Sequence, residues 1–135
     1  MDNSWVTQIE EKVESYLKAE LPEDVSVTSE DYTGDTAVFP AVYVKELTQQ
    51  EIGSELMGDT IAAVRSTFQI EVYTNASTEN KELSTKVMLL MKELSFEVIA
   101  APLKTQQIGY YRSVSRYRRV VAGGDVQLIS EDDWD

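Results

Sequence analysis

Two segments of the chain carry apolar residues at helical spacing, with polar residues on the remaining positions. The first segment follows a possible cap at Asn3 or Ser4 and ends before Pro22, because the residue before a proline avoids helical backbone angles. Its apolar stripe is Val6, Ile9, Val13 and Leu17. The second helix is expected over residues 78–94, after a cap at Ser77. Its stripe is Leu83, Val87, Leu90 or Met91, and Leu94.

Alternation of apolar and polar residues predicts strands in the rest of the chain. They are expected at residues 25–28, 40–47, 67–74, 96–99, 103–105, 110–121 and 126–129. In the strand 67–74, Phe68, Ile70 and Val72 face one way, and Gln69, Glu71 and Tyr73 face the other. This alternation predicts one core side and one solvent side, as in an antiparallel sheet. Turns are expected around Gly34 and at Gly123-Gly124, and a polar loop over residues 48–64.

The order of these elements predicts an α+β fold, with one mostly antiparallel sheet and two helices packed on one face. A chain of 135 residues suits one domain. We therefore expect a single α+β domain over residues 1–129. The last six residues, 130–135, carry four carboxylates and one tryptophan, and we interpret them as an acidic C-terminal tail.

Composition limits the chemistry. The formal net charge of −12 disfavours non-specific binding to DNA or to anionic membranes. The chain has no cysteine, which excludes disulfides and thiol chemistry, and no histidine, the commonest general base and usual zinc ligand. No stretch of 18 apolar residues exists, and the N-terminus is acidic, so neither a membrane span nor a signal peptide is expected. The expectation is an intracellular, soluble protein.

No residue set is typical of an active site. The carboxylate pair Glu10-Glu11 and the acidic run at 131–133 arise readily by composition in so acidic a chain. Ser113 and Ser115 lack a histidine to activate them. Gly123-Gly124 precedes no helix, so no phosphate-binding loop is present. We therefore expect no enzymatic activity, no catalytic residues, no cofactor and no metal.

The most unusual feature is a basic strand. Four of the twelve basic residues, Arg112, Arg116, Arg118 and Arg119, fall within eight positions of residues 110–121. As a strand, this segment puts Arg112, Val114, Arg116 and Arg118 on one face. The other face carries Tyr111, Ser113, Ser115, Tyr117 and Arg119. The local positive charge indicates docking onto an acidic surface.

Two interpretations of the arginines stay open. They could protect an edge strand, or pair with carboxylates of the same subunit. Alternatively they form a subunit interface, where arginine is enriched. Direct nucleic-acid binding fits less well in so acidic a protein. Trp134 is either an interface anchor or part of a disordered tail. The candidate interface residues are Arg112, Arg116, Tyr117, Arg118, Arg119 and Trp134.

The chain resembles the tail terminator (tail completion) proteins of tailed bacteriophages. The resemblance rests on the order of elements and on three short patterns across about residues 3–122. The first is Phe39-Pro40 at the start of a strand, and the second is the sequence Gln-Ile-Glu-Val-Tyr-Thr-Asn at residues 69–75. The third is the late pattern Arg112-Ser-Val-Ser-Arg116-Tyr117.

The resemblance implies a non-enzymatic structural protein. Members of this family cap the tail tube as rings, commonly hexamers, and present a surface to the head connector. The implied partners are copies of the chain itself, the tail tube protein and the head–tail connector protein. The implied location is the head–tail junction of the virion, after assembly in the host cytoplasm. A head–tail joining (stopper) protein is the nearest alternative, and a small regulatory ligand-binding domain is an alternative from another class.

Overall fold

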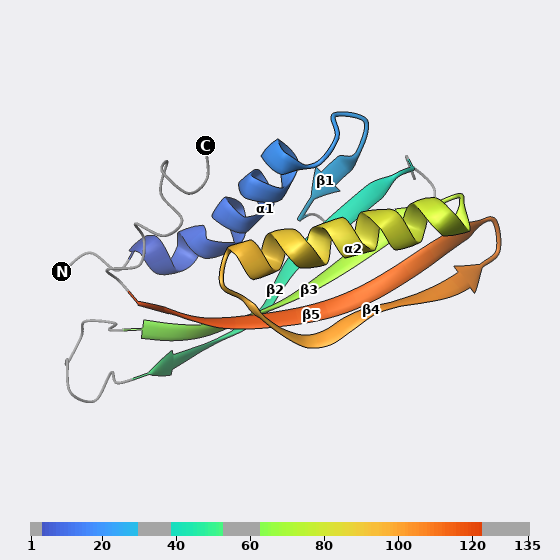
Figure 1. Ribbon diagram of the computed structural model, residues 1–135. Helices are drawn as coiled ribbons and strands as arrows, with labels where there is room; N and C mark the ends of the chain where they lie inside the picture. The colour runs from blue at the N-terminus through green and yellow to red at the C-terminus, as the bar shows by residue number, and fades with distance from the viewer. Residues whose placement is uncertain (1–3, 30–38, 53–62, 123–135) are drawn as a thin grey trace.

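The computed structural model describes residues 4–29, 39–52 and 63–122. The elements follow one another as η1 (Ser4–Gln8), α1 (Ile9–Glu20), β1 (Ser26–Thr28), β2 (Ala41–Ile52), β3 (Ala63–Thr74), α2 (Ser77–Glu93), β4 (Glu97–Gln107) and β5 (Tyr110–Ala122). Figure 1 shows the long strands crossing the molecule beneath the two helices.

The strands form one five-stranded sheet in the order β1-β2-β3-β5-β4. The pairs β2–β3, β3–β5 and β4–β5 are antiparallel, whereas the short edge strand β1 pairs with β2 in parallel. The α+β class is therefore confirmed, but the sheet is mixed and not antiparallel throughout. In the parallel pair, Ser26 lies opposite Ala41 and Thr28 opposite Tyr43, so both strands run the same way.

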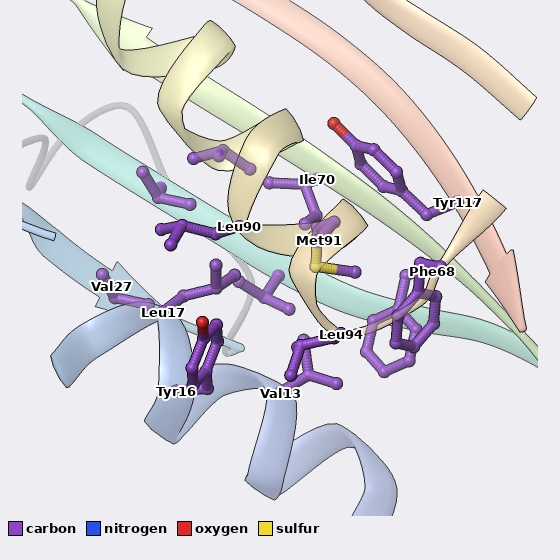
Figure 2. Close-up of a cluster of buried hydrophobic side chains, with 14 of the residues drawn as sticks. Val13, Tyr16, Leu17, Val27, Phe68, Ile70, Leu90, Met91, Leu94 and Tyr117 are labelled. Atoms are coloured by element: carbon purple, nitrogen blue, oxygen red, sulfur yellow. The ribbon is translucent and has the colours of Figure 1, made fainter. Parts of the chain in front are cut away.

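Both helices contribute to one buried cluster with inward-facing strand residues (Figure 2). Each helix supplies the stripe that its sequence predicts. From α1 these are Ile9, Val13 and Leu17, and from α2 and the residue that follows it they are Leu83, Val87, Leu90, Met91 and Leu94. The strands add Val42, Val44, Phe68, Ile70, Val72, Tyr117 and Val121. Burial of these side chains is the main stabilising contribution to the fold.

The cap of the second helix differs from the predicted one, and Asn3, one of two candidates for the first, lies outside the described residues. The first helix opens as the 3-10 turn η1 from Ser4, and α1 follows Gln8, which makes no side-chain capping bond. Ala76 precedes α2, and Ser77 is its first residue. The Ser77 hydroxyl instead accepts a hydrogen bond from Lys104 Nζ of β4, so it links the helix to the sheet.

The alternation predicted for the basic strand is confirmed. In β5, Ser113, Ser115, Tyr117 and Val121 are buried on the side of the hydrophobic cluster. Arg112, Arg116 and Arg118 point to the opposite side, here called the outer face of the sheet. Residues paired directly across the strands share this face, because opposite residues in a ladder point the same way.

The polar loop predicted over residues 48–64 is shorter than expected. Strand β2 extends to Ile52 and β3 begins at Ala63, and the two remain paired along this polar stretch. A register shift between Glu46 and Thr48 leaves Leu47 without a partner. Backbone pairing continues through polar residues because the ladder uses N–H and C=O groups, whatever the side chains are. Residues 53–62 lie outside the described part.

The two short strands predicted near Pro102 are one strand, β4. Its pairing with β5 shifts register between Val98 and Ala100 and again between Ala100 and Leu103. These irregularities break the alternation that would reveal a single strand in the sequence. β4 and β5 are joined by Ile108 and Gly109, and Gly109 has φ +86°, a conformation that favours glycine.

Several predicted features lie outside the described residues. They are the turn around Gly34, the Gly123-Gly124 turn, the strand at 126–129 and the acidic tail at 130–135 with Trp134.

Candidate interaction surface

Charge is unevenly distributed over the chain. All twelve basic residues lie in the described part, whereas nearly half of the 24 acidic residues lie outside it. The described part is therefore close to neutral. The basic residues of its outer face are Lys45, Arg65, Arg112, Arg116 and Arg118. The acidic residues described on that face are Glu71 and Glu97, so the face is net positive.

Arg112 is paired within its own subunit. Its guanidinium lies 2.8 Å from Oε1 of Glu71, and its Nε donates to the same oxygen at 3.0 Å. Glu71 also accepts hydrogen bonds from the Tyr73 hydroxyl and from Gln69 Nε2. The carboxylate side chain is only 10% exposed, so the pair is part of the folded subunit and not a free docking group.

The pKa values in this cluster follow from the contacts. Burial alone would raise the pKa of Glu71, but hydrogen bonds from Tyr73, Arg112 and Gln69, with the Arg112 charge, lower it below its ordinary value. Burial, followed by the hydrogen bond to Glu71, raises the pKa of Tyr73 to about 12. Glu71 is therefore a carboxylate and Tyr73 a neutral phenol at neutral pH.

An aromatic cluster adjoins this pair. Tyr43 and Tyr73 are buried although they point to the outer face, and Phe39 and Tyr110 pack against them. The rings of Phe39 and Tyr110 are stacked with centroids 5.7 Å apart. The sequence predicted a solvent side for Glu71 and Tyr73, and that prediction is wrong at this end of the sheet. The cause is the aromatic packing together with the Arg112 ion pair.

The exposed arginines lie farther along β5. Arg116 Nε donates to the neutral Gln69 Oε1 at 3.0 Å. Arg118 forms an ion pair with Glu97 at 2.7 Å, with the two side chains 49% and 63% exposed. Each guanidinium carries five N–H donors, so both retain donors for a partner.

The remaining candidates are not all at the surface. Tyr117 is fully buried, and its hydroxyl donates to Ser115 Oγ, so it supports the core and no partner reaches it. The physical reason is strand parity, which places Tyr117 on the face opposite to Arg116 and Arg118. Arg119 is half-buried, and its guanidinium donates to the Leu94 carbonyl at the end of α2.

Sequence reasoning missed Arg65, which the structure places near the arginines of β5. Arg65 lies on β3 opposite Val120, and its guanidinium contacts the neutral amide of Gln50. With Arg118, Arg119, Ser95, Glu97 and Val120 it lines a hollow of about 460 Å³, here called the arginine hollow. Arg65 falls between the predicted loop at 48–64 and the predicted strand at 67–74. The sequence therefore did not show on which face of the sheet its side chain lies.

The exposed arginines are expected to contribute little to stability. Because Arg118 and Glu97 are largely hydrated, Arg118→Ala should reduce the free energy of unfolding by about 0–1 kcal/mol. Urea denaturation at pH 7 measures this, with Lys92→Ala on the exposed side of α2 as the control. A loss above about 2 kcal/mol would show that Arg118 holds the fold, and would count against a role for it in binding.

No site for other chemistry is evident in the described residues. No helix in residues 4–29, 39–52 and 63–122 is long and apolar enough to cross a membrane. Within the same ranges, no group of three or more acidic side chains is arranged to hold a metal ion. Comparison with protein-family models and with curated proteins gives no match for this chain.

Proposed function

We propose that this protein is a non-enzymatic structural protein that closes into a ring and terminates a bacteriophage-type tail tube. In this proposal, helices α1 and α2 cover one face of the sheet, and the outer face contacts other protein subunits. Sequence resemblance is one support. The other is the net positive outer face with the exposed Arg116 and Arg118 on it.

The observation that carries the proposal is the placement of these arginines. A regular strand projects them from a rigid sheet, so their positions are fixed before any partner arrives, and less side-chain ordering is needed on binding. Exposed ion pairs of this kind contribute little to folding. Arginine also binds carboxylates with two parallel hydrogen bonds, which suits protein interfaces.

The ring should be detectable directly. We expect the purified protein to form hexamers at high concentration, or on addition of purified tail tubes. Native mass spectrometry over a concentration series measures the stoichiometry, and negative-stain microscopy shows whether tube ends carry a cap. A protein that stays monomeric at every concentration, and leaves tube ends bare, would contradict the proposed function.

A further inference from the structure

We infer that copies of this chain associate head to tail, with the arginine hollow of one copy receiving the rim of an acidic groove on the next. This inference rests on the proposed ring-forming function and identifies the two surfaces that would make the contact. It commits to a second copy of this chain as the occupant of the hollow.

The acidic groove is formed where the end of α1, the start of α2 and the start of β2 meet. It has a volume of about 540 Å³ and an apolar floor that includes Leu21, Val25 and Leu83. Its acidic lining residues are Glu20, Asp24, Glu79 and Glu82. The basic residue in its lining is Lys86, so the groove is net negative.

The groove carboxylates are available for a partner. No other residue in the described part forms a hydrogen bond or ion pair with the side chains of Glu20, Asp24, Glu79 or Glu82. Three of the four are exposed and Glu79 is half-buried. Because no described side chain pairs with these carboxylates, an arriving guanidinium can bind them without breaking an existing contact.

The arginine hollow has the complementary character. Among the described residues, Arg65 and Arg118 bring two guanidinium groups to it against one carboxylate, Glu97, and Arg119 lines it while bonded to the Leu94 carbonyl. Val120 is 44% exposed there and supplies an apolar surface beside the charges. Charge and apolar contact therefore match between the two sites, as they do in specific protein interfaces.

The two sites lie at opposite ends of the molecule. The hollow is built from the start of β3, the end of β5 and the start of β4. The groove is built from the end of α1, the start of α2 and the start of β2, and Figure 1 shows where these elements lie. Along β3, the eight residue-to-residue steps from Arg65 to Tyr73 span roughly 25 Å between these ends. Complementary patches at opposite ends produce heterologous contacts, which build a ring when the rotation between copies closes.

A charge exchange tests the contact. The hollow variant carries Arg65→Glu with Arg118→Glu, and the groove variant carries Glu79→Lys with Glu82→Lys. In either variant alone, the hollow of one copy and the groove of the next carry the same sign of charge. In an equimolar mixture with the two variants alternating, the hollow of each variant meets an oppositely charged groove of the other. We expect each variant alone to associate at least tenfold more weakly than wild type, and the mixture to recover to within about threefold, by sedimentation velocity.

Matched controls carry the same change of charge elsewhere. Lys18→Glu with Lys92→Glu matches the hollow variant, and Glu11→Lys with Glu51→Lys matches the groove variant, all at exposed positions outside both linings. Both controls should associate within about threefold of wild type. Thermal unfolding checks that every variant is folded. If a charge reversal unfolds the chain, neutral substitutions replace it in the test. These are Arg65→Gln with Arg118→Gln for the hollow and Glu79→Gln with Glu82→Gln for the groove. Each neutral pair should weaken association at least threefold.

The outcomes separate the two proposals. If wild type associates and both variants associate equally well, the head-to-tail contact is wrong, while a ring through other surfaces still stands. If the hollow variant fails and the mixture does not recover, the hollow contacts a surface of the next copy other than the acidic groove, and the proposed hollow–groove contact is overturned. If wild type stays monomeric with and without tail tubes, the proposed function itself fails.

Discussion

Replacing Phe68 by alanine is expected to lower the free energy of unfolding by about 3–5 kcal/mol, the usual effect of removing a large aromatic side chain from a packed core. Phe68 is fully buried in the middle of β3. Its ring meets Phe96 edge to face, with centroids 5.5 Å apart at an interplanar angle of 87°. Truncation would leave a cavity between β3 and the residues that follow α2, and the surroundings can fill it only in part.

Leu89→Ala is the matched control. Leu89 is on α2 but is 50% exposed, so its truncation should cost less than about 1 kcal/mol. Both values come from urea denaturation at pH 7 on the same preparation. If Phe68→Ala lost no more stability than Leu89→Ala, Phe68 would not occupy the core, and the pairing of β3 in this register would be wrong. A domain at the lower end of the usual stability range of about 5–15 kcal/mol would keep little net stability after this substitution.

Glu71→Gln is expected to destabilise the protein by about 1–3 kcal/mol at pH 7, the usual range for a hydrogen-bonded charged group. The substitution keeps the shape but removes the charge that Arg112 and Tyr73 contact. Arg112 is 35% exposed, so water compensates part of the loss and keeps the effect below that of Phe68→Ala. The Glu97 side chain is 63% exposed in its ion pair with Arg118. Glu97→Gln should therefore lower the free energy of unfolding by less than about 1 kcal/mol.

The effect of Glu71→Gln should depend on pH. The pKa of Glu71 is lowered below its ordinary value of 4.5 in the folded protein, so the unfolded chain takes up the proton first as pH falls. The stability that the Glu71 charge contributes is therefore complete above pH 4.5 and is lost as pH falls through the folded pKa. Urea unfolding of wild type and Glu71→Gln at pH 7 and pH 3 should show the gap narrowing. A constant gap would contradict the ion-pair account.

Periodicity predicted the helices and the faces of the strands well. The stripe on α2 and the alternation along β5 depend only on local spacing, and each is as expected. The sequence predicted two short strands in place of β4, because the register shifts and Pro102 interrupt the alternation of apolar and polar residues. The extension of β2 to Ile52 was missed, because a polar strand end has the composition of a loop.

The interaction surface was only partly predictable. The sequence showed which arginines share a face, but not that Arg112 pairs with Glu71, 41 positions away, since that contact depends on the β3–β5 register. Parity placed Tyr117 on the face opposite to Arg112, yet its match to a short pattern kept it among the interface candidates. The arginine hollow that Arg65 lines and the acidic groove each form where three elements meet in space. No local pattern in the sequence reveals such a meeting.

The irregular edge strand β4 has a consequence for polymerisation. An exposed strand edge offers unpaired N–H and C=O groups to another chain, and proteins with long regular edges tend to extend into fibrils. Pro102 has no N–H to offer, and the two register shifts beside it prevent a continuous second ladder. Growth by β-sheet extension along β4 is therefore blocked, and the contact proposed between copies uses side chains in place of a shared strand ladder.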